Sequence, residues 1–146
     1  MEPVTKKQLS RYIGLKIQNE NYAERIARMR SSVQFPPMQY EQNESQHQPG
    51  GVDRLGAAVT HALEVEDELE ARIAANCEEM RKLRSAIATL EPMEANVLWL
   101  RYIDDLDGQR RTWEDIADKM YHNVDKVRTV TRLHGQALEH IRKVSV

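Results

Sequence analysis

The chain has 146 residues, of which 30% are charged and 5% are aromatic, and its formal net charge is −2. This length suits one domain, or a small domain with an extended element, and the composition favours solvated helices over a sheet. The longest apolar run, Val97–Leu100, is far shorter than the roughly 20 residues of a membrane-spanning helix, and residues 1–5 lack the apolar core of a secretory signal. We therefore expect a cytoplasmic protein that does not associate with membranes.

The charges are unevenly distributed along the chain. Residues 1–33 contain seven Lys or Arg against three Asp or Glu, and residues 126–146 contain five against one. The two segments between them, 34–90 and 91–125, are both acidic. The small net charge argues against a protein that binds polyanions in general. A short basic segment can still contact phosphate, because its local charge matters more than the total charge of the chain.

A first helix is predicted from Thr5 to Val33. Thr5 and Gln8 have the spacing of a capping box, in which each side chain binds the backbone of the other residue. Alternating steps of three and four residues then select a narrow, mostly apolar seam of the coiled-coil kind. Its positions are Tyr12, Leu15, Asn19, Tyr22, Ile26, Met29 and Val33.

A polar connector and a long helix follow. Residues 34–51 are rich in Gln, Pro, Ser and Asn, a composition that buries too little apolar surface to order itself. From Val52 to Leu90 the seam pattern continues without a slip, and charged residues cover the other sides, so one stripe of this helix needs a partner. The seam positions are Val52, Leu55, Val59, Ala62, Glu66, Leu69, Ile73, Asn76, Met80, Leu83, Ile87 and Leu90.

The two seams predict a long antiparallel helical hairpin, coiled-coil-like, over residues 1–90. Because the first helix is the shorter, the remaining length of the second seam is expected to meet either a second copy of the chain, forming a homodimer, or the C-terminal module. Asn19 and Asn76 occupy seam positions. Such residues either fix the register of the pair at some cost in stability or face water at a frayed point.

Residues 91–146 are predicted to form a C-terminal domain of three to four helices. Pro92 marks a helix start, since proline is tolerated at the first helical position. The segment Met93–Ile103 is apolar on nearly every side and is expected in the middle of the domain, and Asp104–Arg111 reads as a loop. Thr112 then caps a new helix whose first acids suit the positive end of its dipole.

The spacing after Thr112 is that of a helix-turn-helix. Ala117 supplies the small residue needed where the two helices cross, and Val127 and Val130 return at the spacing of the second helix's inner face. Tyr121 is a departure, because a tight turn usually favours glycine there. Gly135 lies inside the second helix, and we expect it to allow close approach of the helix that contains Leu98.

Helix geometry places an opposite, basic face toward solvent. Arginine can read guanine through two hydrogen bonds in the major groove, threonine can contact a base, and lysine can hold phosphate. The alternative interpretation is a solvated basic helix with no ligand. The candidate DNA-binding residues are Asn123, Val124, Asp125, Lys126, Arg128, Thr129, Arg132 and His134.

Three motifs carry a resemblance to a known family. They are Leu98-Trp99-Leu100-Arg101-Tyr102, Thr112-Trp113-Glu114-Asp115-Ile116-Ala117 and Arg132-Leu133-His134-Gly135-Gln136-Ala137-Leu138. Together they resemble region four of bacterial sigma factors, in the version found in phage and prophage late-transcription regulators of the RinA/ArpU type. Those proteins also place an N-terminal helix, a polar connector and a long acidic helix before the module. This chain departs from the pattern in having about three extra residues before Arg132, which changes the side chains expected in the groove.

The resemblance implies a sequence-specific transcriptional regulator that binds double-stranded promoter DNA and activates phage late genes with host RNA polymerase, close to the bacterial nucleoid. No segment resembles the promoter-melting region of a full sigma factor. We expect no enzyme, cofactor or metal site, because the five histidines lack ligand spacing and there is no Gly-rich phosphate loop. Two alternatives stay open: a small terminase-like DNA-packaging protein, and a coiled-coil interaction protein that binds no DNA.

Overall fold

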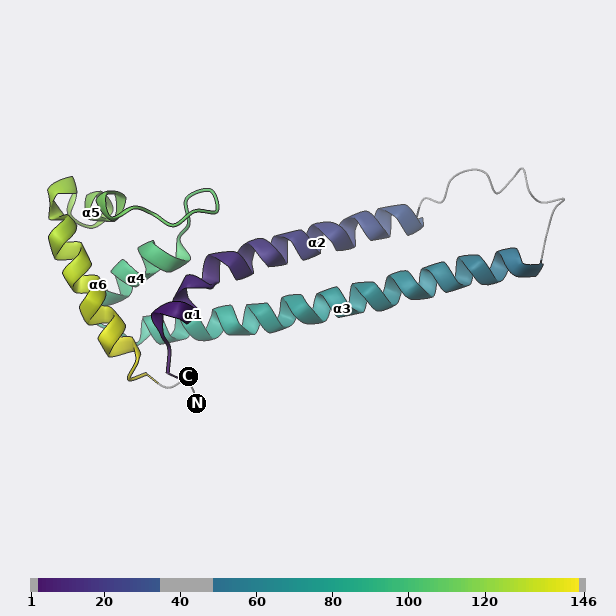
Figure 1. The fold of residues 1–146 in the computed structure, drawn as a ribbon, viewed down its shortest axis with the longest axis horizontal. Helices are drawn as coiled ribbons and strands as arrows, with labels where there is room; N and C mark the ends of the chain where they lie inside the picture. Colours follow the sequence, from purple (N-terminus) through teal and green to yellow (C-terminus); the bar gives the residue numbers. More distant parts are fainter. Residues whose placement is uncertain (1–2, 35–48, 145–146) are drawn as a thin grey trace. The chain divides into compact units, whose positions relative to one another are not determined.

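The computed structural model describes residues 3–34 and 49–144, and its named elements are all helical (Figure 1). Within these residues there is no strand, only an isolated bridge between Leu106 and Gln109 in a loop. The predicted all-α class is confirmed. Most of the predicted connector, residues 35–48, lies outside the described residues. Over the same two ranges, no helix is both long enough and apolar enough to cross a membrane.

The chain divides into two compact units. The first comprises residues 1–18 and 76–146, and the second comprises residues 19–75. This division differs from the boundary expected at residue 91, since residues 1–18 and 76–90 group with the C-terminal segment. The reason is shared burial: Leu9 and Ile87 belong to the same apolar cluster as Leu98.

The first predicted helix is two helices, α1 (Lys6–Ser10) and α2 (Tyr12–Gln34). The capping box at Thr5 is confirmed: Thr5 Oγ1 accepts from the Gln8 amide at 3.4 Å, and Gln8 Oε1 accepts from the Thr5 amide at 3.0 Å. The continuous helix expected across Arg11 is wrong. The Arg11 amide donates to the Gln8 carbonyl at 3.1 Å, the i to i−3 bond of a 3-10 turn rather than the i to i−4 bond of an α-helix.

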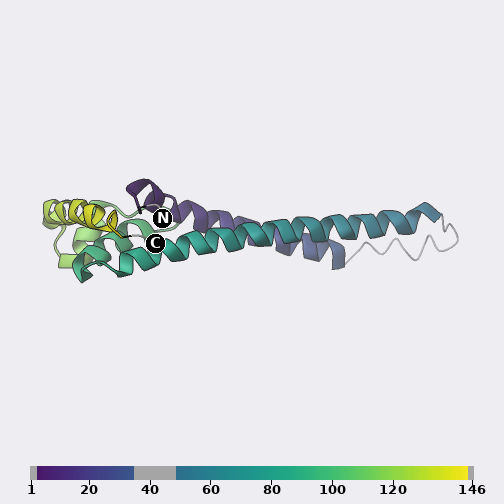
Figure 2. The same ribbon diagram turned by 90° about the horizontal axis from the view of Figure 1, so that it is seen from below.

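The long helix α3 runs from Pro49 to Ala88 without a break (Figures 1 and 2). It begins three residues before the predicted Val52, because proline is tolerated in a first turn. Each predicted seam position from Val59 to Leu90 is buried or half-buried, which confirms the register. Val52 and Leu55, by contrast, lie outside the residues whose side chains are described.

Side chains of α2 and α3 contact each other within each unit. In the first unit, Arg84 of α3 donates to the Tyr12 hydroxyl at 2.6 Å, and Asn76 Nδ2 donates to Gln18 Oε1 at 2.8 Å. From Tyr12 to Gln18 along α2, the contacted residue of α3 changes from Arg84 back to Asn76, so the two segments are antiparallel. In the second unit, Arg30 pairs with Glu66 and, at 3.2 Å, with Glu70. Asn76, one of the two seam asparagines, is therefore hydrogen-bonded rather than facing water at a frayed point.

The C-terminal helices follow α3 closely. The predicted start at Pro92 is confirmed, since α4 covers Pro92–Leu98 and continues into a π-helical turn, η2 (Trp99–Ile103). After the predicted loop come α5 (Trp113–Tyr121), a single 3-10 turn η3 (Val124–Lys126) and α6 (Val127–Ile141). Thr112 caps α5 as expected, with its Oγ1 accepting from the Asp115 amide at 3.2 Å.

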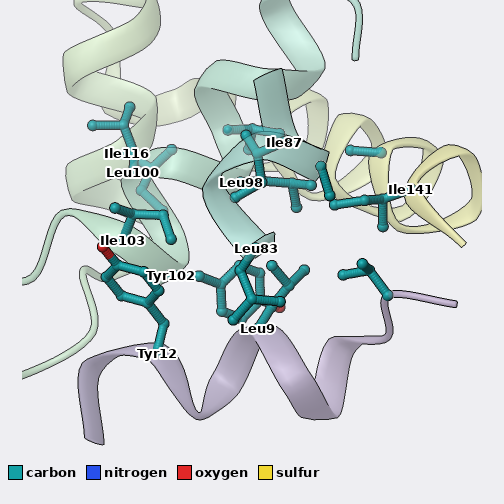
Figure 3. Packing of buried hydrophobic residues seen from close by; sticks show 14 of the residues in the cluster. Leu9, Tyr12, Leu83, Ile87, Leu98, Leu100, Tyr102, Ile103, Ile116 and Ile141 are labelled. Carbon is teal, nitrogen blue, oxygen red and sulfur yellow. The ribbon is translucent and has the colours of Figure 1, made fainter. Parts of the chain in front are cut away.

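One apolar cluster holds the first unit together. Figure 3 shows Leu9, Leu83, Leu98 and Ile141 converging from α1, α3, α4 and α6. Each is at most 3% exposed. Burial of such apolar side chains is the main source of stability for a domain of this size. The apolar cluster that α5 and α6 pack against therefore includes residues of the N-terminal helices.

The segment Met93–Ile103 lies in the middle of the domain as expected, but two of its apolar side chains are exposed. Val97, Leu98 and Tyr102 are at most 1% exposed, but Met93 is 37% and Trp99 is 41% exposed. These two side chains border an apolar surface pocket of about 480 Å³ with Ile87, Ala88, Pro92, Ala95 and Asn96. A helix that is apolar all round can thus still leave one side uncovered.

Candidate nucleic-acid interface

Ala117 of α5, the small residue expected where the two helices cross, belongs to the same apolar cluster as Val130 of α6. Ala117 is fully buried, and so are Ile116 beside it and Val130 on α6. A larger side chain at Ala117 would disturb the packing of α5 and α6, because protein interiors are close-packed. This contact fixes which side of α6 faces the protein.

The turn between the two helices has a different construction from the one expected at Tyr121. The left-handed residue is His122, with φ of 54°, and it ends α5 with its amide donating to the Asp118 carbonyl at 2.8 Å. Asn123 then caps η3, its Oδ1 accepting from the Asp125 amide at 2.9 Å. The three residues of η3 match the number of extra residues inferred before Arg132.

This construction corrects the predicted recognition face. Val124, Asp125 and Lys126 lie on the 3-10 turn η3, not on the helix α6, which begins at Val127. A 3-10 helix has 3.0 residues per turn rather than 3.6, so side chains on η3 fan out differently from those on α6. The candidate residues therefore fall into two groups, one on the turn and one on the helix.

Most of the candidate residues are exposed. Arg128 and Arg132 stand four residues apart on one side of α6, whereas Thr129 beside them is half-buried. On the turn, all four candidates are exposed: Asn123, Val124, Asp125 and Lys126. These seven residues form the candidate interface; of them, three are cations and one, Asp125, is an acid.

His134 does not belong to this surface, contrary to prediction. It is 7% exposed, its Nε2 lies 2.7 Å from the Tyr102 hydroxyl, and its ring meets Trp113 edge-on at 4.8 Å between centroids. Burial, with smaller contributions from Lys6 and Arg101, lowers the pKa of His134 to about 4. Its imidazole is neutral at pH 7 and packs the underside of α6.

The basic residues of the candidate interface contrast with the other arginines of the domain. Arg111 pairs with Asp104 at 3.1 Å and with Asp115 at 2.8 Å, and Arg101 stacks over the Trp113 ring at 4.2 Å. Within the described part of the chain, no ion pair is recorded for Lys126, Arg128 or Arg132. Their charges are left to an external anion or to water.

The start of α6 is also unusual for a helix N-terminus. It has no side-chain cap and no acid in its first turn, and Lys126 and Arg128 flank it. Since the N-terminus of a helix carries partial positive charge, cations there are destabilising and anions are favoured. The 3-10 turn η3 runs directly into this start, and it brings the Asn123 cap and the acid Asp125 next to the two cations.

Two features of this surface escaped the sequence analysis. Gln136 is exposed four residues after Arg132 and extends the same side of α6, a spacing that the sequence already contained. A pocket of about 410 Å³ adjoins Arg132 and Gln136, and its wall comes partly from α4, which no local pattern links to α6. Its other lining residues are Glu91, Met93, Tyr121, Thr129 and Leu133.

The expected role of Gly135 is wrong. It is exposed, and a Cβ built on it would have no atom within 4 Å, so it does not mediate a close approach to the helix of Leu98. The link between α6 and α4 is instead made by His140, whose Nδ1 lies 2.7 Å from a carboxylate oxygen of the buried Glu94. This pair holds the C-terminal part of α6 on the domain.

Across residues 3–34 and 49–144, no group of three or more His, Cys, Asp or Glu side chains is arranged to hold a metal ion. Comparison of the chain with protein-family models, with curated proteins and with solved structures found no match. What supports a function is therefore the chemistry of the residues themselves.

Proposed function

We propose that this protein is a sequence-specific DNA-binding transcriptional regulator, in which α5, the turn and α6 act as a helix-turn-helix and α6 enters the major groove. The observation that carries the proposal is the position of Arg128 and Arg132. Both are exposed on the side of α6 that faces away from the buried Val130, Ala137 and Ile141. Recognition helices use this arrangement: an apolar side held by the domain and a polar side offered to base edges.

The chemistry of these side chains fits base readout. A guanidinium can donate two hydrogen bonds to O6 and N7 of guanine, the commonest specific contact in the major groove. Lys126, at the start of α6, is placed to meet phosphate together with the helix N-terminus. The acidic residues elsewhere in the chain would be repelled by DNA, which favours approach through this face.

The regulatory part of the proposal draws on the resemblance to region four of sigma factors. We extend it to promoter DNA, to phage late-gene activation and to contact with host RNA polymerase. The antiparallel segments of α2 and α3 would form the hairpin that carries the module, and they would pair two copies of the chain. In this arrangement the protein assists polymerase and does not replace an initiation factor.

The test is selection of DNA from a random pool with the full-length protein, followed by affinity measurements by fluorescence anisotropy. Arg128→Ala and Arg132→Ala are each expected to cost about 1–3 kcal/mol of binding and to relax the preference for particular bases. Lys126→Ala should weaken all sequences alike and reduce the salt dependence of Kd. All three side chains are exposed, so the melting temperature should change little.

Arg28→Ala is the matched control, because Arg28 is an exposed helical arginine in the second unit, on α2. It removes the same charge from the chain and should leave affinity unchanged. If Arg28→Ala and Arg128→Ala lose the same affinity for the selected DNA, the loss follows from net charge alone and the proposed interface is wrong. Ring oligomers that bind DNA without promoter preference would favour the packaging role, and no binding even at low salt would favour the coiled-coil interaction protein.

A further inference from the structure

Val124 is an apolar side chain placed among charged and polar ones. It is 54% exposed, and His122, Asn123, Asp125 and Lys126 around it in sequence are all exposed as well. From Thr112 to Val144, the other large apolar residues are buried or half-buried, and Val124 stands outside the apolar cluster of the domain. Folding of the first unit therefore gains little from this valine.

The turn holds Val124 in a defined position. Asn123 has extended backbone angles, and its side chain accepts from the Asp125 amide at 2.9 Å. The Asn123 carbonyl also accepts from the Lys126 amide at 3.2 Å, which closes the 3-10 turn around Val124. A β-branched side chain has few rotamers, so its methyl groups point in a restricted direction. Val124 is thus a fixed apolar projection immediately before α6.

Its place in the row of candidate contacts is significant. Val124 lies on η3, which leads directly into α6 at Val127, so it precedes Arg128 and Arg132 at the N-terminal end of that helix. Recognition helices contact base edges mainly through their N-terminal residues, so the position of Val124 is among the first to enter the groove. In the major groove the apolar feature of the bases is the 5-methyl group of thymine.

We propose that Val124 recognises the 5-methyl group of a thymine in the operator, next to the guanine read by Arg128. This inference rests on the proposed DNA-binding function and specifies one base of the site. The acid beside it supports a selective surface, because Asp125 repels phosphate and can accept a hydrogen bond only from a base amino group, that of cytosine or of adenine. A pair of residues that cannot bind the backbone contributes selectivity rather than general affinity.

The experiment uses the full-length protein and the operator obtained by selection. Each thymine is replaced in turn by deoxyuridine, which removes the methyl group and keeps every hydrogen bond of the base pair. One such replacement should raise Kd about four-fold for the wild type, the value expected for losing one buried methyl. For Val124→Ala the same replacement should have little effect, because the contact is already absent.

Leu106→Ala is the control variant, because Leu106 is also 54% exposed but lies in the loop before α5. It should keep the four-fold response to deoxyuridine. If the wild type binds the operator through Arg128 but no thymine is sensitive, or if Val124→Ala keeps the sensitivity, the assignment of Val124 is overturned and the DNA-binding function stands. If the protein selects no DNA, the proposed function and this inference both fail.

Discussion

The inner and outer faces of α6 differ in every property that bears on folding. Val130, Ala137 and Ile141 on the inner face are fully buried, and the inner-face His134 is hydrogen-bonded to Tyr102. On the outer face, Arg128 and Arg132 are exposed and have no ion pair among the described residues, and a Cβ built on the exposed Gly135 would have no atom within 4 Å. Residues that fold the domain are thus separated from residues available to a ligand, although both occupy one helix of 15 residues.

The first turns of α5 and α6 also differ from each other. Thr112 caps α5, and Glu114 and Asp115 lie in its first turn, where the helix dipole favours negative charge. The first turn of α6 has neither a cap nor an acid. The 3-10 turn η3 precedes α6 instead, with its cap at Asn123 and with Asp125 inside the turn, so the two helices begin in different ways.

The largest effect is expected for a deletion on the inner face. Ile141→Ala removes a fully buried side chain from the core and leaves a cavity, so the free energy of unfolding should fall by about 2–5 kcal/mol. Chemical denaturation followed by circular dichroism measures this loss. Ile17→Ala is the matched control, since Ile17 is 39% exposed on α2 and its truncation should cost far less. Equal costs at the two positions would contradict the burial of Ile141 on the inner face of α6.

The pH dependence of stability tests the inner face at His134. Burial holds the pKa of His134 at about 4, against 6.5 in the unfolded chain, so the unfolded state binds more protons between these values. Stability from the neutral His134 is complete above about pH 6.5 and should decrease as the pH falls toward 4, by about 3 kcal/mol at most.

Denaturation of wild type and His134→Gln at several pH values separates this contribution from that of the carboxylates. The glutamine amide still accepts from the Tyr102 hydroxyl, whose pKa burial raises so that it keeps its proton. The variant should lose less stability than the wild type between pH 6.5 and 4. If the free energy of unfolding depends on pH in the same way for the two proteins, the imidazole is in contact with water and His134 lies on the outer face.

Local patterns were sufficient to predict much of the fold. The caps at Thr5 and Thr112, the helix start at Pro92 and the seam of α3 depend on residues close in sequence, and the structure confirms them. The burial of Ala117 was also predictable, because a small residue at that spacing is typical of a packed position. These features follow from helix period and capping chemistry alone.

The errors arose where distant segments or backbone details decide the outcome. His134 belongs to the row Val130, His134, Ala137, Ile141, whose helical spacing marks an inner position, but its partner Tyr102 lies 32 residues away. The break at Arg11 and the 3-10 turn before α6 are backbone details of a few residues: the Arg11 amide donates to the Gln8 carbonyl, and the cap at Asn123 accompanies η3. Composition and periodicity do not contain such contacts.

The smallest effect is expected on the outer face, at Gly135. Glycine inside a helix is less favourable than alanine by about 0.5–1 kcal/mol, because its backbone loses more freedom on folding. A Cβ at Gly135 meets no atom within 4 Å, so Gly135→Ala should stabilise the protein by about that amount, measured by denaturant unfolding. Gly135 thus occupies an outer-face position where a side chain has room, although glycine is unfavourable for folding there.

Gly14→Ala separates this interpretation from a general helix effect. Gly14 is likewise an exposed helical glycine with no atom within 4 Å of a built Cβ, but it lies on α2. Both substitutions should raise stability, and only Gly135→Ala should also change affinity for the selected DNA, since it adds a methyl group between Arg132 and Gln136 on the outer face. If both variants are stabilised and neither alters binding, the outer face of α6 ends at Arg132, and contact with DNA is confined to the turn and the first two turns of the helix.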